Sequence, residues 1–202
     1  MHIAIAGNIG SGKTTLTSLL AKHFKWSPIY EKMEANPYIE NFYNDMRRWS
    51  FNLQIYFLNS RFRHLVEAKK LHENIIQDRT IFEDAYIFAP NLYAMGLMTT
   101  RDYETYMDIF DLLSSFVPSP DLIIYLKASV PTLVKQIQKR GREYESSIRL
   151  DYIGSLNDRY EEWLDSYKGR LLVIDMDEKN IDRPEDMNEI IEKVNAEFHG
   201  LF

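Results

Sequence analysis

The sequence lacks cysteine, and this absence excludes disulfides, thiolate metal sites and cysteine nucleophiles. It also lacks any run of about 18 apolar residues, so we expect no segment to span a membrane. The start of the chain, MHIAIAGNIG, has no basic residues before a short apolar stretch, so we expect no secretory signal. A chain without cysteine fits a reducing compartment, and we therefore expect a cytoplasmic protein.

The chain also lacks an excess of basic residues. It has 24 Lys and Arg against 30 Asp and Glu, which gives a net charge of −6. Residues 171–202 hold nine acidic and three basic residues, so this segment accounts for the whole deficit. A nucleic-acid-binding protein normally carries a basic excess that neutralises phosphates. We therefore expect no nucleic-acid partner, and we expect any phosphate chemistry to depend on a few local cations.

Glycine is scarce as well, with 8 in 202 residues, and three of these lie between residues 7 and 12. Elsewhere, short apolar segments alternate with stretches of helical periodicity. Asn36 can cap the second helix, and Pro37 fits its first position. The expected strands are 3–6, 29–30, 75–77, 122–126 and 171–174, and the expected helices are 14–24, 36–46, 49–73, 82–95, 101–116, 131–140, 149–167 and 184–198.

This order of elements predicts the fold class. Short, nearly continuous apolar strands that alternate with helices indicate a parallel sheet covered on both faces. A length of 202 residues without an internal repeat, linker or low-complexity tract fits one domain. We therefore expect one α/β domain over residues 1–202, with three α/β/α layers, about five parallel strands and a helical lid.

The glycine-rich segment between the first strand and the first helix matches a phosphate-binding loop. Residues 7–14 read GNIGSGKT, which fits G-x-x-x-x-G-K-[ST] in full and in the required strand–loop–helix context. The loop amides and the helix N-terminus can hold phosphate oxygens, Lys13 can reach the β and γ phosphates, and the Thr14 hydroxyl can bind Mg²⁺. We therefore expect a P-loop fold that binds ATP or GTP through Gly7, Asn8, Ile9, Gly10, Ser11, Gly12, Lys13 and Thr14.

An ordinary glycine turn is the alternative, and the match of both pattern and context disfavours it. The loop alone does not separate a kinase from a nucleotide-dependent switch or an ATPase.

Two strand ends place charged side chains where ligands bind in an open α/β sheet. Asp78 follows the strand 75–77 and is a candidate metal ligand, and Arg79 beside it can hold a phosphate or a carboxylate. A salt-bridged strand end is the alternative. Glu31 follows the strand 29–30 and could accept the proton of an attacking hydroxyl, although an exposed surface glutamate fits equally well.

Two arginines, Arg140 and Arg142, flank Gly141 at the end of a predicted helix. This arrangement suggests a mobile cationic flap that closes on a transferring phosphoryl group and stabilises its charge. A solvated helix end is the alternative, because basic residues favour helix C-termini.

Two predicted helices each place a pair of chemically informative residues on one face. Gln54 and Arg61 are seven residues apart on the long helix, and Asp84 and Phe88 are four residues apart on the helix after Arg79. Asp84 could pair with Arg61 across a pocket, whereas a purely structural ion pair is the alternative.

These motifs in this order resemble the deoxyribonucleoside kinase family, and especially its bacterial deoxyadenosine and deoxycytidine kinases. The resemblance covers roughly residues 1–175. Beyond the phosphate loop it rests on EANPY (34–38), YNDMRRWSFNLQIYFL (43–58), QDRTIFED (77–84), PDLIIYLKAS (120–129) and RGREYE (140–145).

The resemblance implies a role for each matching residue. Glu31 falls at the general base for the sugar 5′-hydroxyl, Arg79 at the arginine that holds this carboxylate and the phosphates, and Asp78 at the acidic residue near Mg²⁺. The remaining matches are to residues that bind substrate or form the lid: Gln54 for the base edge, Phe88 for base stacking, Tyr43 and Glu145 for the 3′-hydroxyl, Arg140 and Arg142 for the lid, and Arg61 with Asp84 for the ion pair of members that use purines and cytosine.

The resemblance also implies ATP and Mg²⁺ as cofactors, a deoxynucleoside as substrate and a homodimer formed through the layer of the long helix. The leading hypothesis is therefore an ATP-dependent deoxynucleoside 5′-kinase. A nucleoside monophosphate kinase similar to thymidylate kinase would need further cations for the phosphate of its acceptor. A nucleotide-dependent switch or binding protein would leave Glu31, Gln54 and Tyr43 without a role.

The base preference can be argued from hydrogen bonding. Adenine and cytosine offer an amino donor beside a ring-nitrogen acceptor, whereas guanine and thymine offer a carbonyl beside an N–H. Gln54 can serve either pattern by turning its amide, but an ionised Asp84 only accepts. The sequence therefore favours deoxyadenosine or deoxycytidine over thymidine, with deoxyguanosine as a further alternative.

Overall fold

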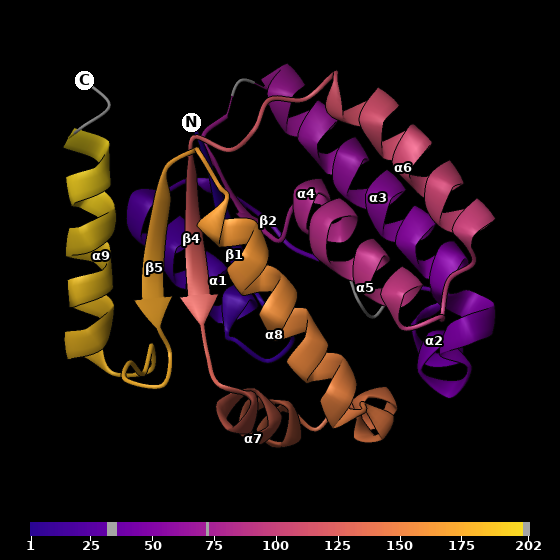
Figure 1. Cartoon of the computed structure of the whole chain (residues 1–202). Coiled ribbons are helices and arrows are strands. Elements are labelled where there is room, and N and C mark those ends of the chain that lie inside the picture. Colours follow the sequence, from indigo (N-terminus) through magenta and orange to yellow (C-terminus); the bar gives the residue numbers. More distant parts are fainter. Residues whose placement is uncertain (32–35, 72, 200–202) are drawn as a thin grey trace.

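The computed structural model describes residues 1–31, 36–71 and 73–199, and these residues form a five-stranded sheet (Figure 1). The strand order is β2-β3-β1-β4-β5, and every neighbouring pair is parallel. The predicted parallel sheet is therefore present. Its strands are β1 (His2–Gly7), β2 (Ser27–Ile29), β3 (Ile75–Asp78), β4 (Leu122–Lys127) and β5 (Leu171–Asp175).

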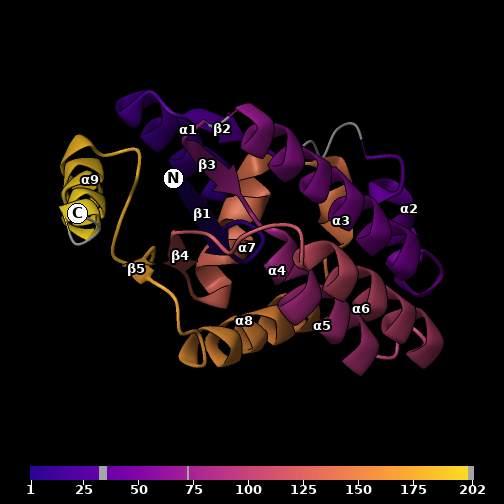
Figure 2. The same ribbon diagram turned by 90° about the horizontal axis from the view of Figure 1, so that it is seen from above.

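Helices cover both faces of the sheet, as the view from above shows (Figure 2). Ile3 and Ile5 of β1 pack with side chains of α1 and α9 on one face, whereas Ala4 and Ala6 pack with side chains of α2, α3 and α8 on the other. The predicted α/β/α layering is therefore confirmed. The helices are α1 (Lys13–Phe24), α2 (Ile39–Asn44), α3 (Met46–Leu71), α4 (Ile81–Glu83), α5 (Ala89–Ala94), α6 (Thr100–Ser114), α7 (Val130–Arg140), α8 (Leu150–Asp165) and α9 (Pro184–His199).

Among these described helices, none combines the length and the apolar character that crossing a membrane requires.

The predicted start of the second helix was wrong. α2 begins at Ile39, and Asn36 instead accepts a hydrogen bond from the Tyr38 backbone N–H at 2.9 Å. Asn36 therefore closes a turn before the helix, which is a common competing use of this side chain. The long helix α3 starts at Met46, three residues before its predicted start. Residues 34 and 35 of the EANPY motif lie outside the described residues.

The segment predicted as one helix over residues 82–95 consists of three parts. A π-helical segment, Asp84–Phe88, separates α4 from α5. Pro90 lies in the first turn of α5, where its missing N–H removes one bond of the regular α-helical ladder. π-helical segments are frequent at functional sites. Asp84 and Phe88 lie at the two ends of this one and are both buried.

The chain between α7 and α8 forms the lid segment, which we define as residues 140–147. α7 ends at Arg140, and Gly141 follows in the left-handed conformation with a φ of 66°. A 3₁₀ turn, Glu143–Ser147, then leads into α8. The predicted helical lid is therefore a helix end followed by a single short turn.

The phosphate loop packs so closely on α7 that Gly10 has no room for a side chain. A Cβ at Gly10, which has a φ of 88°, would lie 2.7 Å from the Leu133 carbonyl oxygen and 2.9 Å from Ile137 Cγ1. We expect Gly10→Ala to lower the free energy of unfolding by about 2–5 kcal/mol, through this clash and the positive φ.

Gly96→Ala is the matched control, because Gly96 also has a positive φ of 68° but no atom within 4 Å of the added Cβ. This control should lose only about 1–2 kcal/mol. Urea unfolding curves measure both variants, and equal losses would show that the contact with α7 is not tight.

Candidate active site

A pocket opens at the carboxyl end of the strands, and most of the predicted site residues line it. Its walls come from the phosphate loop, the ends of β2 and β3, α2, α3, the π-helical segment, the lid segment and α8. Gly7, Asn8, Ser11, Gly12 and Arg61 do not line the pocket. Gly7 and Arg61 lie directly behind its wall, where Gly7 contacts Arg79 and Arg61 contacts Glu31.

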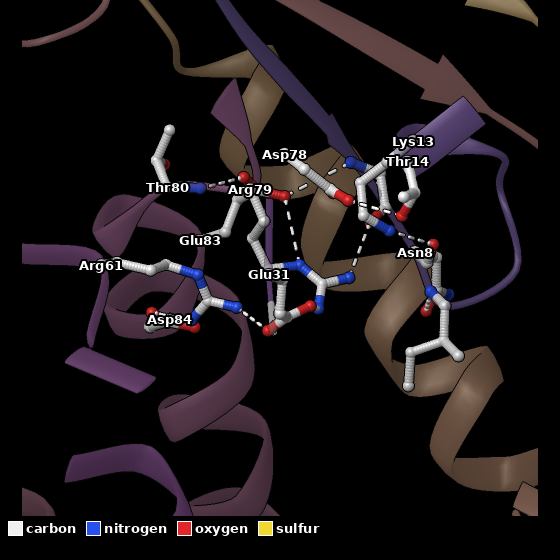
Figure 3. A network of polar contacts seen from close by, with 12 residues as sticks. Asn8, Lys13, Thr14, Glu31, Arg61, Asp78, Arg79, Thr80, Glu83 and Asp84 are labelled. Atoms are coloured by element: carbon white, nitrogen blue, oxygen red, sulfur yellow. Dashed lines mark hydrogen bonds and ion pairs between the residues drawn. The ribbon is translucent and has the colours of Figure 1, made fainter. Parts of the chain in front are cut away.

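Lys13 lies in the phosphate loop with its amino group turned back onto the loop (Figure 3). Lys13 Nζ donates a hydrogen bond to the Asn8 carbonyl oxygen at 2.8 Å, and the residue is buried. Burial, assisted by the positive charge of Arg79, lowers the pKa of Lys13 to about 7. An anion bound in the loop would offset this cost and restore the charge on Lys13.

Thr14 and Asp78 meet beside the loop and fit a magnesium site. The Thr14 hydroxyl donates to Asp78 Oδ2 at 2.5 Å, and Asp78 Oδ1 is buried without a hydrogen-bond partner. A hydroxyl and a carboxylate are oxygen ligands of the kind Mg²⁺ takes, and Mg²⁺ commonly completes its shell with waters and phosphate oxygens. Among the described residues there is no cluster of three or more His, Asp or Glu side chains that could hold an ion alone.

Four side chains with alternating charge form a row of ion pairs beside the pocket (Figure 3). Arg61 is ion-paired with both Glu31 and Asp84, so the Arg61–Asp84 pair predicted from the sequence is present. Arg79 Nη1 lies 3.4 Å from Glu31 Oε2 on the other side. All four side chains are at most 10% exposed, so each charge depends on its neighbours for compensation.

The pKa values of the two carboxylates in this row, Glu31 and Asp84, are shifted in opposite directions. Burial acts to raise the pKa of Glu31, but Arg61 and Arg79 outweigh it, and the pKa lies below its usual value. Burial raises the pKa of Asp84 to about 7, although Arg61 opposes the change. Glu31 is therefore a carboxylate across the neutral range, whereas burial disfavours the charged form of Asp84.

Arg79 is held by its backbone as well as by its partners. Its φ of 65° is left-handed, which is unusual for a residue other than glycine and is a form of strain found at functional sites. Its guanidinium carbon lies 4.5 Å from the centroid of the Phe88 ring. The residue after β3 therefore turns its side chain back across the ends of the strands and into the pocket.

The opposite wall of the pocket brings the lid segment against α2. Glu145 is buried and accepts hydrogen bonds from Arg140, at 3.1 Å to Nε and 2.5 Å to Nη2. Arg142 Nη1 lies 3.6 Å from the same carboxylate. Tyr43 stacks on Tyr144 with ring centroids 5.8 Å apart. The two lid arginines are thus gathered by Glu145 in this conformation.

Gln54 lines the pocket and has spare hydrogen-bonding capacity. It is 2% exposed, and its Oε1 atom is buried without a partner. Buried polar atoms are rarely left unpaired, so an orphaned amide oxygen that faces a pocket indicates a ligand with a donor group. Phe88 is buried nearby and lines the same pocket.

Two residues that the sequence interpretation did not identify contribute to the site. Glu83 and Tyr160 are fully buried, and each contacts Gly7 of the phosphate loop. The spacing Thr80-x-x-Glu83 is that of a helix capping box and could have drawn attention to Glu83. Tyr160 belongs to no motif.

The lowered pKa of Lys13 leads to a measurable proton uptake. At pH 8 the free Lys13 is mostly neutral, and a bound anion would raise its pKa and charge it. We expect sulfate binding at pH 8 to take up roughly one proton, because sulfate itself does not titrate there. Calorimetry in buffers of different ionisation enthalpy measures this uptake. Uptake that persists in Lys13→Met, or none in the wild type, would contradict the assignment.

Comparison with known proteins places these features in a family. A family model described as deoxynucleoside kinase matches residues 3–199. The chain is 39% identical over 167 residues to the deoxyadenosine/deoxycytidine kinase of Bacillus subtilis, covering 82% of this chain and 77% of the relative. It is 38% identical over 200 residues to the deoxyadenosine kinase of Dictyostelium discoideum, covering 99% of this chain and 80% of the relative.

A solved structure of deoxyadenosine kinase from M. mycoides, with the products dCMP and a flexible dCDP bound, superposes with a TM-score of 0.87 at 36% identity. The superposition covers 97% of this chain and 100% of that one. A second structure of the M. mycoides enzyme, with dATP bound, gives a TM-score of 0.85 at 36% identity over 96% of this chain and 100% of that one. The match over residues 3–199 and these identities show that the chain belongs to the deoxynucleoside kinase family.

Proposed function

We propose that the protein transfers the γ-phosphoryl group of ATP to the 5′-hydroxyl of deoxyadenosine or deoxycytidine and so forms the 5′-monophosphate for nucleotide salvage. The observation that carries this proposal is the position of Glu31. Its carboxylate is held by two arginines in the pocket that also contains Lys13 of the phosphate loop. Phosphoryl transfer to a hydroxyl requires a general base and a polyphosphate site in the same pocket.

The donor end of the reaction follows from the loop. The backbone N–H groups and Lys13 would hold the β and γ phosphates of ATP, and a dATP-bound relative supports a purine triphosphate in this fold. Thr14 and Asp78 would hold Mg²⁺, which when bound supplies positive charge to the phosphates of the donor. The orphaned Asp78 Oδ1 atom supports this assignment.

At the acceptor end, Glu31 would accept the proton of the 5′-hydroxyl as that oxygen attacks the γ-phosphorus. Arg79 would orient Glu31 and face the phosphoryl group, and Arg140 and Arg142 would add charge from the lid segment as the transition state forms. The pairing of both lid arginines with Glu145 supports a coupled movement, because a 3′-hydroxyl that binds Glu145 and Tyr43 would compete for the same carboxylate.

Base recognition would use Gln54, Asp84 and the ring of Phe88. Gln54 can donate to a ring nitrogen and accept from an amino group, and an ionised Asp84 can accept a second amino hydrogen. Both adenine and cytosine have this amino group beside a ring nitrogen. The names of the Bacillus and Dictyostelium relatives support the same two bases.

Two alternatives, a monophosphate kinase and a nucleotide-dependent switch, have less support. The relatives compared above are named as deoxynucleoside kinases. A monophosphate acceptor would need cations beyond those used by the donor. Among the described residues, the cations that line the pocket are Lys13, Arg79, Arg140 and Arg142, all of which the proposed transfer uses.

We also propose that the protein is a cytoplasmic homodimer. α3 and α6 lie side by side at one end of the molecule (Figures 1 and 2). Leu112 and Phe116, in and just after α6, are 62% and 60% exposed. Exposed large apolar side chains at the end of a helix layer support a surface that a second copy covers.

Glu31→Gln tests the assignment of Glu31 as the general base. The substitution keeps the size of the side chain and removes its ability to take a proton. We expect a folded variant that binds deoxyadenosine within about threefold of the wild type and has kcat reduced by about 10²–10³. Glu40→Gln, on the exposed side of α2, is the control and should keep wild-type turnover. Near-normal kcat in Glu31→Gln would show that Glu31 is not the general base.

A panel of deoxynucleosides and ribonucleosides with ATP, ranked by kcat/KM, tests the acceptor. We expect deoxyadenosine or deoxycytidine to lead thymidine by about tenfold or more, because each hydrogen bond that reads the base contributes differential binding. Asp84→Asn should narrow this gap, since the new amide can donate as well as accept. Thymidine as the best substrate, or deoxyadenosine monophosphate as a better acceptor than deoxyadenosine, would refute the proposal.

A further inference from the structure

A glutamate and a tyrosine that the proposed mechanism does not use are buried directly behind the phosphate loop. Glu83 ends α4 and Tyr160 lies in α8, so the pair joins two elements far apart in the chain. Both residues have no exposed surface, and the Tyr160 hydroxyl lies 2.8 Å from Glu83 Oε1. Side chains this costly to bury need a compensating set of partners.

Glu83 uses both carboxylate oxygens to accept backbone hydrogen bonds. Glu83 Oε2 accepts from the Thr80 N–H at 2.9 Å, and Glu83 Oε1 accepts from the Gly7 N–H at 3.3 Å. A glutamine could not replace it fully, because its amide nitrogen would face one of these N–H donors. The position therefore requires two acceptor oxygens and ties the end of β1 to the turn after β3.

The same pair also reaches Arg79. Arg79 Nε lies 3.8 Å from Glu83 Oε1, and Arg79 Nη2 donates to the Gly7 carbonyl oxygen at 3.2 Å. The Tyr160 hydroxyl lies 2.7 Å from that carbonyl oxygen, so its single hydrogen can serve either Gly7 or Glu83. Gly7 is thus held through its N–H by Glu83, and through its carbonyl by Arg79 and Tyr160.

We propose that Glu83 and Tyr160 are positioning residues that hold the guanidinium of Arg79 and the first residue of the phosphate loop in one fixed geometry. Because α8 directly follows the lid segment, Tyr160 also ties the lid-bearing helix to this geometry. The inference rests on the proposed function in one respect, namely that Arg79 acts on the general base Glu31 and on the phosphoryl group. Small displacements of such a group slow a reaction strongly, by about a hundredfold for 1 Å.

Tyr160→Phe tests the pair with the smallest possible change. It removes one hydroxyl and leaves the ring, which stacks on Tyr125 with centroids 5.6 Å apart. We expect kcat to fall by about tenfold or more while the KM for the nucleoside changes less than about twofold, because Tyr160 does not line the pocket. Glu83→Gln should lower kcat at least as much.

Tyr125→Phe is the matched control. The Tyr125 hydroxyl donates a hydrogen bond at 3.1 Å to Glu161 of α8, the helix that also carries Tyr160. Tyr125 does not line the pocket. We expect kcat within about twofold of the wild type. If Glu83→Gln does not fold, the comparison of Tyr160→Phe with Tyr125→Phe decides alone. Unchanged kcat in Tyr160→Phe would overturn the inference.

The Arg79→Lys background separates positioning from general destabilisation. If Tyr160 acts through Arg79, Tyr160→Phe should lower kcat by less than about twofold in the Arg79→Lys background. The same loss in both backgrounds would overturn the inference. A wild type that phosphorylates no deoxynucleoside would refute the proposed function instead. Sulfate affinity then still reports the geometry of the loop: Tyr160→Phe should weaken it more than Tyr125→Phe, and equal affinities would overturn the inference.

Discussion

Mutual compensation among buried charges is the constraint on which the catalytic end of this protein depends. Arg61 lies between Glu31 and Asp84, and Arg79 lies between Glu31 and Glu83. Each charge would be too costly to bury alone, and removal of one partner from such a pair typically costs about 3–5 kcal/mol. Because these side chains come from the end of β2, from α3, from the turn after β3, from α4 and from the π-helical segment, their pairing fixes where these elements meet.

This charged frame is compensated internally, yet it leaves a few polar atoms without partners. Gln54 and Asp78 both line the pocket, and the Oε1 atom of Gln54 and the Oδ1 atom of Asp78 have no hydrogen-bond partner. Burial and the positive charge of Arg79 lower the pKa of Lys13 in the phosphate loop to about 7. These are the places where the base, the metal and the phosphates would complete the structure. The frame thus compensates its own charges, and the groups that would select ligands are those left without partners.

The sequence could predict those parts of the molecule that rest on local spacing. The phosphate loop follows a fixed pattern, and the pairing of Arg61 with Asp84, which the family resemblance implied, is present. The contact between Glu83 and Tyr160 could not be found in this way, because the two residues are 77 positions apart and meet only through the packing of α8. Asn36 was misread because its side chain serves a turn and a helix cap equally well. The π-helical segment could not be predicted either, because it depends on tertiary packing, which the hydrophobic periodicity of the sequence does not reveal.

The central claim is that a preformed arginine frame aims Glu31 at the 5′-hydroxyl of an uncharged nucleoside. A crystal structure with deoxyadenosine and a non-hydrolysable ATP analogue tests it most directly. The account predicts the 5′-oxygen within about 3 Å of the Glu31 carboxylate, with Arg79 still bound to Glu31 and Lys13 on the terminal phosphates. A 5′-oxygen far from Glu31, while Glu31 stays paired with Arg61 and Arg79, would contradict it.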